Sequence, residues 1–343
     1  MFSSELNIVF SFLSSFLLTF LIIPKIILFS KRLRLFDMPG HRAAHNSGVP
    51  IFGGVAIFIG VIFSLLIWGD LENIQFLLAS LLVVFFVGLI DDLLSLSPVK
   101  KILGQIIAIL IIIYLQEIKI DNFHGVLSIY DISNLFSLLF TVFVVIVITN
   151  GFNLIDGVDG LAGGVGIISS LAFGIIALIM NQHDIAIISF TLSGSLVAFL
   201  KYNFHPASIF MGDTGSLVVG MILSILAINL IDTGIVTNTI SFPNKGPLLA
   251  IIFLAIPLFD SLRVFLNRVR KGKQPLTAAR DHVHHALLDL GLGHKNTARV
   301  IYLISIFLIA ISYFLLPLNI NIGILILAVI TYLILLFPYI LKK

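Results

Sequence analysis

Acidic side chains stand repeatedly at the ends of long apolar runs in this sequence. The acids in question are Asp91, Asp92, Asp156, Asp159 and Asp213. A lipid bilayer strongly penalises carboxylates near its centre, so acids placed again and again at its edge indicate function. They predict a membrane protein that acts at one surface on a charged substrate.

Asp91 and Asp92 close one of these apolar runs as an adjacent pair. Two neighbouring carboxylates at a membrane surface can bind a divalent cation, or divide proton transfer and metal binding between them. The competing interpretation is an ordinary acidic helix end in water. The pair alone does not decide between the two.

The segment 150–161 is more informative, because Asn153, Asp156 and Asp159 recur in it at every third residue. This spacing predicts that the three side chains share one side of a helical turn or a tight loop. Glycines between them allow backbone amides to approach a bound anion. A simple turn rich in glycine and aspartate needs no such regular spacing, so the pattern favours a site.

Asp213 stands just before the apolar run 215–231. The N-terminus of a helix favours an acid or a bound phosphate, and an N-capping aspartate is the plainer interpretation. Phe210, three residues earlier, has two interpretations as well. It could stack on a nucleobase or anchor the chain at the membrane interface.

Three histidines in four residues, His282, His284 and His285, indicate either a metal site or phosphate recognition. Zinc would need further ligands, and the chain has no cysteine. Mg²⁺, with Mn²⁺ as an alternative ion, fits the acids better and leaves histidine and arginine for the charge of a diphosphate. Arg42 and His45 are further cationic candidates for phosphate contacts.

The composition defines the setting in which these residues act. Hydrophobic residues make up 59% of the 343 residues and charged residues only 11%, whereas about 25% is usual in soluble chains. The mean hydropathy is +1.15. These values predict a polytopic membrane protein, and no basic cluster beyond what membrane orientation requires points to nucleic acid. Without cysteine, disulfides, thiolate nucleophiles and Cys-ligated zinc are excluded.

A spanning helix needs about 20 mostly apolar residues. We expect one all-α membrane domain over 1–343 with about eleven such helices. They are placed near 6–29, 51–69, 75–91, 102–117, 132–149, 161–180, 185–201, 215–231, 247–264, 298–316 and 320–341. Cytoplasmic loops are then expected near 30–50, 91–101, 150–160, 201–214 and 264–298.

The positive-inside rule supports this topology. With the N-terminus outside, on an uncleaved first span, and the C-terminus in the cytoplasm, all but two of the 20 Lys and Arg residues lie on the cytoplasmic side. The exceptions are Lys119 and Lys245. Every motif above also falls on that side. Acids, amides and cations that converge at one membrane face suit Mg²⁺-assisted phosphoryl transfer involving a lipid.

The motifs resemble those of the polyprenyl-phosphate N-acetylhexosamine-1-phosphate transferases, a superfamily that includes the phospho-MurNAc-pentapeptide translocase. The matching stretches are GLIDD at 88–92 with LSP at 96–98, NGFNLIDGVDGL at 150–161, FMGDTGS at 210–216 and RDHVHH at 280–285. The resemblance implies transfer of a sugar 1-phosphate, most simply GlcNAc 1-phosphate, from a UDP-sugar to undecaprenyl phosphate with release of UMP. It also implies the bacterial cytoplasmic membrane as the location. Whether two copies form a homodimer is left open.

The resemblance also implies roles for single residues. Asp91 and Asp92 would orient or deprotonate the lipid phosphate or help to hold Mg²⁺, and Asp213 would be the principal metal ligand with Asn153 or Asp156 near it. The implied uridine contacts are Asp159, Asn203 and Phe210, with Asn150 in the same motif. The residues implied to meet the diphosphate or the sugar are Arg263, His282, His284 and His285.

Two other functions are weighed against this one. The translocase that uses UDP-MurNAc-pentapeptide is the alternative within the enzyme class. An ion-coupled secondary transporter is the alternative from another class, but it predicts acids deep inside the spans and an internal repeat. The acids here cluster at one face, and the sequence shows no convincing repeat.

Overall fold

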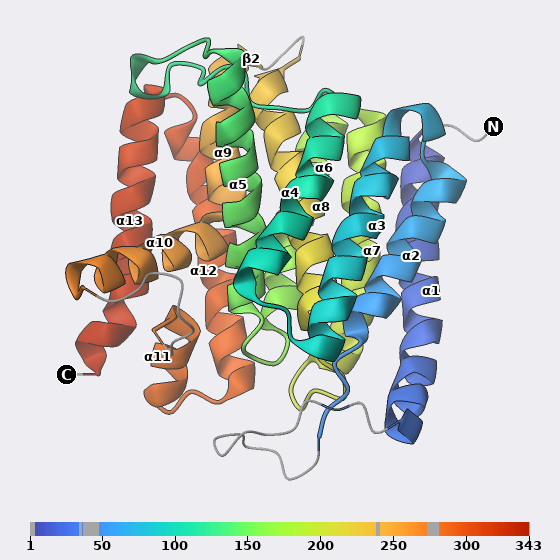
Figure 1. Ribbon diagram of the computed structural model, residues 1–343. Coiled ribbons are helices and arrows are strands. Elements are labelled where there is room, and N and C mark those ends of the chain that lie inside the picture. Colours follow the sequence, from blue (N-terminus) through green and yellow to red (C-terminus); the bar gives the residue numbers. More distant parts are fainter. Residues whose placement is uncertain (1–3, 34–35, 37–47, 238–240, 273–280, 343) are drawn as a thin grey trace.

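The computed structural model describes residues 4–33, 36, 48–237, 241–272 and 281–342, and within them the chain is almost entirely helical (Figure 1). The two short strands β1 (Ile235–Val236) and β2 (Ser241–Phe242) form one antiparallel hairpin. The α-helices are α1 (Ser4–Leu33), α2 (Gly53–Trp68), α3 (Leu71–Leu94), α4 (Pro98–Leu115), α5 (Asn134–Ile155), α6 (Leu161–Ile179), α7 (His183–Asn203), α8 (Gly212–Thr233), α9 (Gly246–Phe253), α10 (Ala255–Arg270), α11 (Val283–Asp289), α12 (His294–Leu315) and α13 (Ile320–Leu341).

The helices confirm the predicted all-α, polytopic membrane architecture. Within the described residues, nine of them are long and apolar enough to cross a bilayer: α1, α3 to α8, α12 and α13. Of the other two predicted spans, the second is the apolar but shorter α2, with 16 residues. The start of α1 and the end of α13 lie at opposite ends of the bundle (Figure 1), as an odd number of crossings requires.

The prediction of one continuous ninth span over 247–264 is wrong. The chain breaks at Leu254 into α9 and α10, which are bent by 70°. Pro257 explains the break, because it has no N–H to donate to the carbonyl of Phe253 four residues earlier. The Ser169 hydroxyl of α6 donates to that carbonyl instead, at 2.6 Å. In Figure 1, α10 consequently runs across the bundle instead of along it.

Several stretches predicted as loops are helical at their ends. The third helix continues through Asp91 and Asp92 to Leu94, so that only 95–97 separate it from α4. Likewise α5 continues to Ile155 and includes Asn150 and Asn153. Apolar runs end at the first polar residues, but helical hydrogen bonding continues beyond them. The polar residues therefore stand on ordered helix ends.

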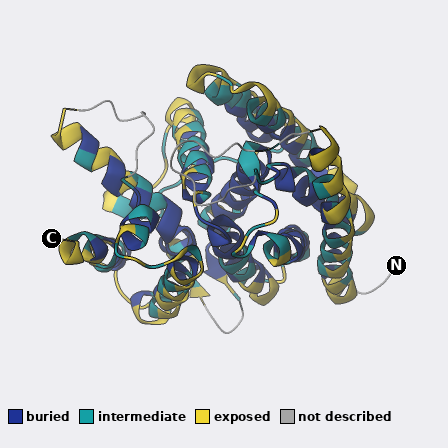
Figure 2. Cartoon of the chain, turned by 90° about the horizontal axis from the view of Figure 1, so that it is seen from below, coloured by how far each residue is buried: buried dark blue, intermediate teal, exposed yellow. Residues whose placement is uncertain are grey.

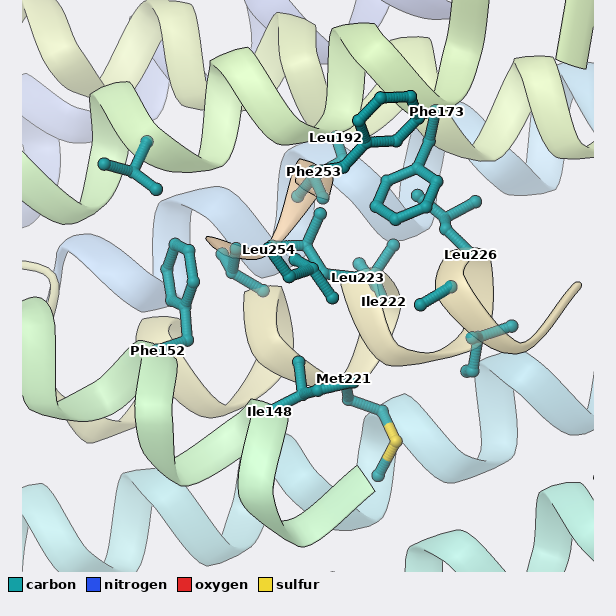
Figure 3. Close-up of a cluster of buried hydrophobic side chains, with 14 of the residues drawn as sticks. Ile148, Phe152, Phe173, Leu192, Met221, Ile222, Leu223, Leu226, Phe253 and Leu254 are labelled. Atoms are coloured by element: carbon teal, nitrogen blue, oxygen red, sulfur yellow. The ribbon is translucent and has the colours of Figure 1, made fainter. Parts of the chain in front are cut away.

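The core surrounds α8, whose residues from Thr214 to Ile228 are all buried. Figure 3 shows Met221, Ile222, Leu223 and Leu226 of this helix meeting side chains from α5, α6, α7 and the α9–α10 bend. Seen along the bundle, buried residues occupy the centre and exposed ones the rim (Figure 2). The rim carries large apolar side chains, such as those along α1 and α13, where lipid would cover them. The central helix α8 thus positions its N-terminal residues rigidly.

Candidate functional site

Asp92, at the end of α3, binds the N-terminus of α8. Its Oδ1 accepts from the backbone N–H of Asp213 at 2.7 Å, and its Oδ2 accepts from the backbone N–H of Thr214 at 2.9 Å and from the Thr214 hydroxyl. These orphan N–H groups and the helix dipole both favour a carboxylate there. Asp92 therefore caps α8 from a neighbouring helix.

Two glycines permit this close approach of α3 to α8. A Cβ on Gly88 would lie 2.5 Å from Thr214 Cα, so the helix backbones touch at this point. Gly212 has a φ of +71°, and a Cβ there would lie 2.7 Å from Asp92 Oδ2. Only glycine adopts such a backbone conformation without strain. The GLIDD and FMGDTGS motifs therefore form one packed unit.

Next to this cap lies a group of side chains that we call the acid cluster: Asp91, Asp92, Lys101, Asn153 and Asp213. The Lys101 ammonium, at the start of α4, pairs with Asp91 Oδ2 at 3.0 Å and with Asp213 Oδ2. Asn153 on α5 donates to Asp213 Oδ1 and, at 2.8 Å, to the Ser216 hydroxyl. Four helices thus converge on Asp213.

The acid cluster has the donor set that Mg²⁺ prefers, namely carboxylate and amide oxygens. Lys101 shows that Asp91 and Asp213 can face one cation together, because its ammonium contacts an oxygen of each. Asn153 places an amide beside the same carboxylate, and turning that amide over would present its oxygen. The residues therefore fit a divalent cation.

Asp156 is half-buried in the loop between α5 and α6. Burial raises the pKa of this carboxyl well above its usual value, and the nearby charges of Asp213 and Asp92 raise it further. Among the loop residues beside the acid cluster, Asp156 is thus the acid whose protonated form is favoured over that of a free carboxyl.

Asp159, in contrast, is held by partners away from the acid cluster. His205 Nδ1 lies 2.7 Å from its Oδ2, His294 Nδ1 lies 3.3 Å from its Oδ1, and the backbone N–H of Ala207 donates to Oδ2 at 3.2 Å. Burial would raise the pKa of Asp159, but the hydrogen bonds from His294, His205 and Ala207 outweigh it and lower the pKa to about 2. We call these residues the Asp159 clamp. It ties the α5–α6 loop to the α7–α8 loop and to α12.

The ligand atoms of Asp159, His205 and His294 lie within 4.8 Å of one another, close enough to hold a metal. The 2.7 Å separation of His205 Nδ1 from the carboxylate, however, has the length of a hydrogen bond donated by the ring. The regular spacing of Asn153, Asp156 and Asp159 does not bring these three side chains to one place, because Asp159 is held by the clamp, away from the acid cluster. The helix ends at Ile155, and the chain then turns Asp159 toward other partners.

Asp260 on α10 organises the histidine motif. This fully buried carboxylate accepts from Arg263 Nη2 and His282 Nδ1, both at 2.8 Å, and from the backbone N–H of Val283 at 3.0 Å. A ring that donates from Nδ1 to a carboxylate has a fixed orientation and leaves Nε2 available. Asp260 thus orients His282 and caps the N-terminus of α11.

His284 connects this group to the 150–161 segment. It is 1% exposed, its ring is parallel to that of His282, and its Nε2 lies 2.9 Å from where a Cβ on Gly157 would be. Burial, and then the neighbouring His285, lower the pKa of His284 to about 3. His284 is consequently neutral at pH 7, which corrects the expectation that all three histidines supply positive charge.

The remaining predicted residues lie apart from the acid cluster. The Asn150 amide donates to Gln105 at 3.0 Å, one helical turn from Asn153. Asn203 accepts from the Gly160 N–H at 2.9 Å and donates to the Ile209 carbonyl at 2.8 Å, so its amide holds two loops. The backbone of Phe210 pairs with Pro50 and Gly53. The calls on Arg42 and His45 lie outside the described residues.

The sequence alone did not identify four residues that complete these groups: Lys101, His205, Asp260 and His294. Lys101 was used only as one of the positive charges that predict the membrane orientation. Asp260 carried a usable signal, because an acid inside a predicted span is itself a functional-site indicator. The two histidines had none, since each stands alone in its own segment.

These features define a multi-pass membrane protein with a carboxylate site at one end of its helical bundle. The model of the family described as "Glycosyl transferase family 4" matches residues 74–231, which include the acid cluster. The "Probable undecaprenyl-phosphate N-acetylglucosaminyl 1-phosphate transferase" of Bacillus subtilis is 33% identical over 90% of this chain and 84% of its own length. The chain belongs to glycosyl transferase family 4.

Two further relatives agree with this assignment. The undecaprenyl-phosphate alpha-N-acetylglucosaminyl 1-phosphate transferase of Haemophilus influenzae is 33% identical over 88% of this chain and 83% of its own length. The decaprenyl-phosphate N-acetylglucosaminephosphotransferase of Mycobacterium leprae is 29% identical over 80% of this chain and 75% of its own length. The similarity covers nearly the whole chain.

Proposed function

We propose that this protein transfers GlcNAc 1-phosphate from UDP-GlcNAc to undecaprenyl phosphate and releases UMP at the cytoplasmic face of the bacterial membrane. The observation that carries the proposal is that Asp91 and Asp213 both face the Lys101 ammonium at the N-terminus of α8, so that the two carboxylates can share one cation. The names of the relatives support a polyprenyl phosphate acceptor and this sugar.

In this proposal Asp213, Asp91 and Asn153 hold Mg²⁺, which would neutralise the diphosphate as the bond to UMP breaks. Both oxygens of Asp92 are engaged with the N-terminus of α8, so Asp92 positions Asp213. Asp91 makes no such cap: its Oδ1 accepts from the Leu96 N–H at 2.6 Å, and its Oδ2 faces the Lys101 ammonium at 3.0 Å inside the acid cluster. This difference supports Asp91 as the group that orients the attacking lipid phosphate.

Charge around the acid cluster is arranged for an anionic substrate. Lys101 lies within the acid cluster. Arg263 shares the Asp260 carboxylate with His282. The His282 ring stacks on that of His284, which lies against Gly157. His282, held through Nδ1, offers Nε2 as a hydrogen-bonding atom. We assign these groups to the diphosphate and the sugar of the donor, and direct attack by the lipid phosphate as the chemical step.

An apolar cavity supports a lipid acceptor. It has a volume of about 290 Å³ and runs between α5, α8 and the α9–α10 bend as far as the α4–α5 loop, with a lining that includes Phe123, Val144, Val147 and Leu254. On α5 this lining, from Phe140 to Ile148, lies between about one and a half and three and a half helical turns from Asn153. A prenyl chain in this groove would place its phosphate toward the acid cluster.

The experiment that tests the function is UMP release by purified protein supplied with undecaprenyl phosphate, Mg²⁺ and a panel of UDP-sugars. We expect release with UDP-GlcNAc that EDTA abolishes and that Asp213→Asn lowers by at least about a thousandfold, in line with losing a principal metal ligand. Asp184→Asn, an acid at the other end of the bundle that pairs with Asn73, is the matched control and should retain activity.

Other results would change the assignment in defined ways. Release only with UDP-MurNAc-pentapeptide would keep the mechanism and replace the sugar. No release with any donor from folded protein would overturn the transferase, and solute uptake into proteoliposomes would then be measured.

A further inference from the structure

The last helix, α13, reaches the histidine motif through Tyr339. The hydroxyl of this half-buried residue donates to the backbone carbonyl of Asp281 at 2.7 Å. Its ring lies under the Arg263 guanidinium, with the Arg263 Cζ 4.4 Å from the ring centroid. Neither contact involves a residue that the proposed chemistry assigns to the acid cluster.

Tyr339 and Arg263 are also connected through the backbone carbonyl of Asp281. The Asp281 carbonyl accepts from both Tyr339 and Arg263 Nη2, and Arg263 Nη2 also donates to Asp260. Arg263 Nε is buried without a hydrogen-bond partner among the described residues. Among the described residues, the guanidinium is therefore held by the hydrogen bonds of Nη2 and by the face of the Tyr339 ring.

Asp260 transmits this position to the histidines. Its second oxygen holds His282 Nδ1, and its first oxygen also accepts from the Val283 N–H that begins α11. The parallel rings of His282 and His284 then bring His284 against Gly157. A continuous series of contacts thus runs from α13 to the loop that carries Asp156.

We propose that Tyr339 is a positioning residue through which α13 fixes the histidine motif against the donor diphosphate. This role rests on the proposed function for its effect on turnover, but the position of the histidines is measurable without turnover. A residue that merely filled space on α13 would leave both the donor kinetics and the histidine environment unchanged.

Three variants separate the parts of this role. Tyr339→Phe keeps the ring under Arg263 and removes the hydrogen bond to Asp281, whereas Tyr339→Leu removes both. Tyr332→Leu is the matched control, because Tyr332 lies on the same helix two turns earlier and is 41% exposed. Tyr339→Phe also keeps nearly the full side-chain volume, so it decides the question if the leucine variant folds poorly.

The kinetic readout is kcat/KM for the UDP-sugar and KM for undecaprenyl phosphate. We expect kcat/KM for the donor to fall about three- to tenfold in Tyr339→Phe, the size of one lost hydrogen bond. Loss of the ring contact as well should lower it about 30- to 100-fold in Tyr339→Leu. The acceptor KM and the control variant should stay within about twofold of the unaltered protein.

The structural readout is the rate at which diethyl pyrocarbonate acylates each histidine, followed by peptide mass spectrometry in detergent. His282 and His284 are 4% and 1% exposed, so they should react slowly in the unaltered protein and several times faster in Tyr339→Leu. His183, at the other end of the bundle, should react equally in all variants. Unchanged histidine reactivity together with unchanged donor kinetics would overturn the proposal. If the unaltered protein releases no UMP, the proposed function fails and the acylation rates alone decide the role of Tyr339.

Discussion

Asp91 and Asp92 are adjacent in the chain but have different partners. Asp92 accepts three hydrogen bonds from the N-terminal turn of α8, whereas Asp91 accepts from the Leu96 N–H and pairs with Lys101. Successive positions on a helix point about 100° apart, which is why the same chemical group serves two purposes here. One carboxylate holds the site together and the other faces its cation.

This difference predicts that matched substitutions of the two acids affect stability differently. Asp92→Asn turns an N–H₂ group toward N–H donors of α8, so we expect unfolding to become easier by about 1–2 kcal/mol, the usual cost of losing a cap. Asp91→Asn should unfold close to the unaltered protein. Both should lose UMP release. Thermal unfolding in detergent, measured alongside activity, checks the pair, and equal stabilities would contradict the capping role.

The Asp159 clamp predicts a pH-dependent contribution to stability. The pKa of Asp159 in the folded protein, about 2, lies below its usual value of 3.8. Its stabilising effect is therefore fully present above the usual value and is lost as the pH falls from about 4 toward 2. Asp159→Asn should cost about 1–2 kcal/mol at pH 7, discounted for the partly exposed His205.

The measurement compares thermal unfolding of Asp159→Asn and the unaltered protein from pH 7 down to pH 3. The difference between them should shrink as the pH falls. The exposed Glu117→Gln is the control and should show no difference at any pH. A gap that stays constant with pH would mean that Asp159 acts through packing and not through its charge.

At the scale of helices, hydropathy was sufficient to predict nine long apolar spans, and the polar motifs at their ends predicted the acids that meet at one end of the bundle. Hydropathy was insufficient for α9 and α10, because an apolar run looks the same whether the helix continues or breaks. Pro257 was the available signal for that break. The partners of Asp159 and Asp260 depend on which loops meet in space, and neither His205 nor His294 has a local pattern that encodes this.

The groove beside α5 predicts a selective effect on the acceptor. Val144 is half-buried and lines the cavity, so Val144→Trp should fill part of it. We expect KM for undecaprenyl phosphate to rise about tenfold or more, because prenyl units that fitted the groove lose their buried contacts, while KM for the UDP-sugar stays unchanged. A phosphate with a two-isoprene chain should be less affected.

The control for this prediction is Leu139→Trp, which adds the same side chain to an exposed position of α5 that does not line the cavity. It should behave like the unaltered protein. An equal rise in the KM of both substrates for Val144→Trp would indicate a general disturbance of the site, and no rise in either would place the acceptor elsewhere.

At the scale of the whole molecule, most of the described basic residues lie at the same end of the bundle as the acid cluster and the histidine motif, with Lys119 and Lys245 as exceptions. The positive-inside rule then predicts a cytoplasmic location for this end. The absence of cysteine in the chain makes the orientation directly measurable, since a single introduced cysteine is the only thiol to label. Glu72 and Lys295 are exposed residues in the first turns of α3 and α12, and these two helices start at opposite ends of the bundle (Figure 1).

Accordingly, Glu72→Cys should react with a membrane-impermeant maleimide in intact cells, and Lys295→Cys should react only after the membrane is permeabilised. Neither substitution removes a contact of the acid cluster, so UMP release should persist and report correct folding. The reverse labelling pattern would move the site to the outer face, where no UDP-sugar is supplied.

The burial of α8 on every side has a consequence for how the chain assembles in the membrane. Among the described helices, its main packing partners α2, α3, α5, α6 and α7 precede it in the chain, and α9 follows it. If the nascent chain is inserted from its N-terminus, most of the helices that surround α8 have therefore already been synthesised when α8 enters the membrane. The glycine-rich, acid-bearing N-terminus of this helix would then pack against protein as soon as it is inserted. If translation paused after α7, the surfaces of the earlier helices that pack against α8 would be exposed to lipid.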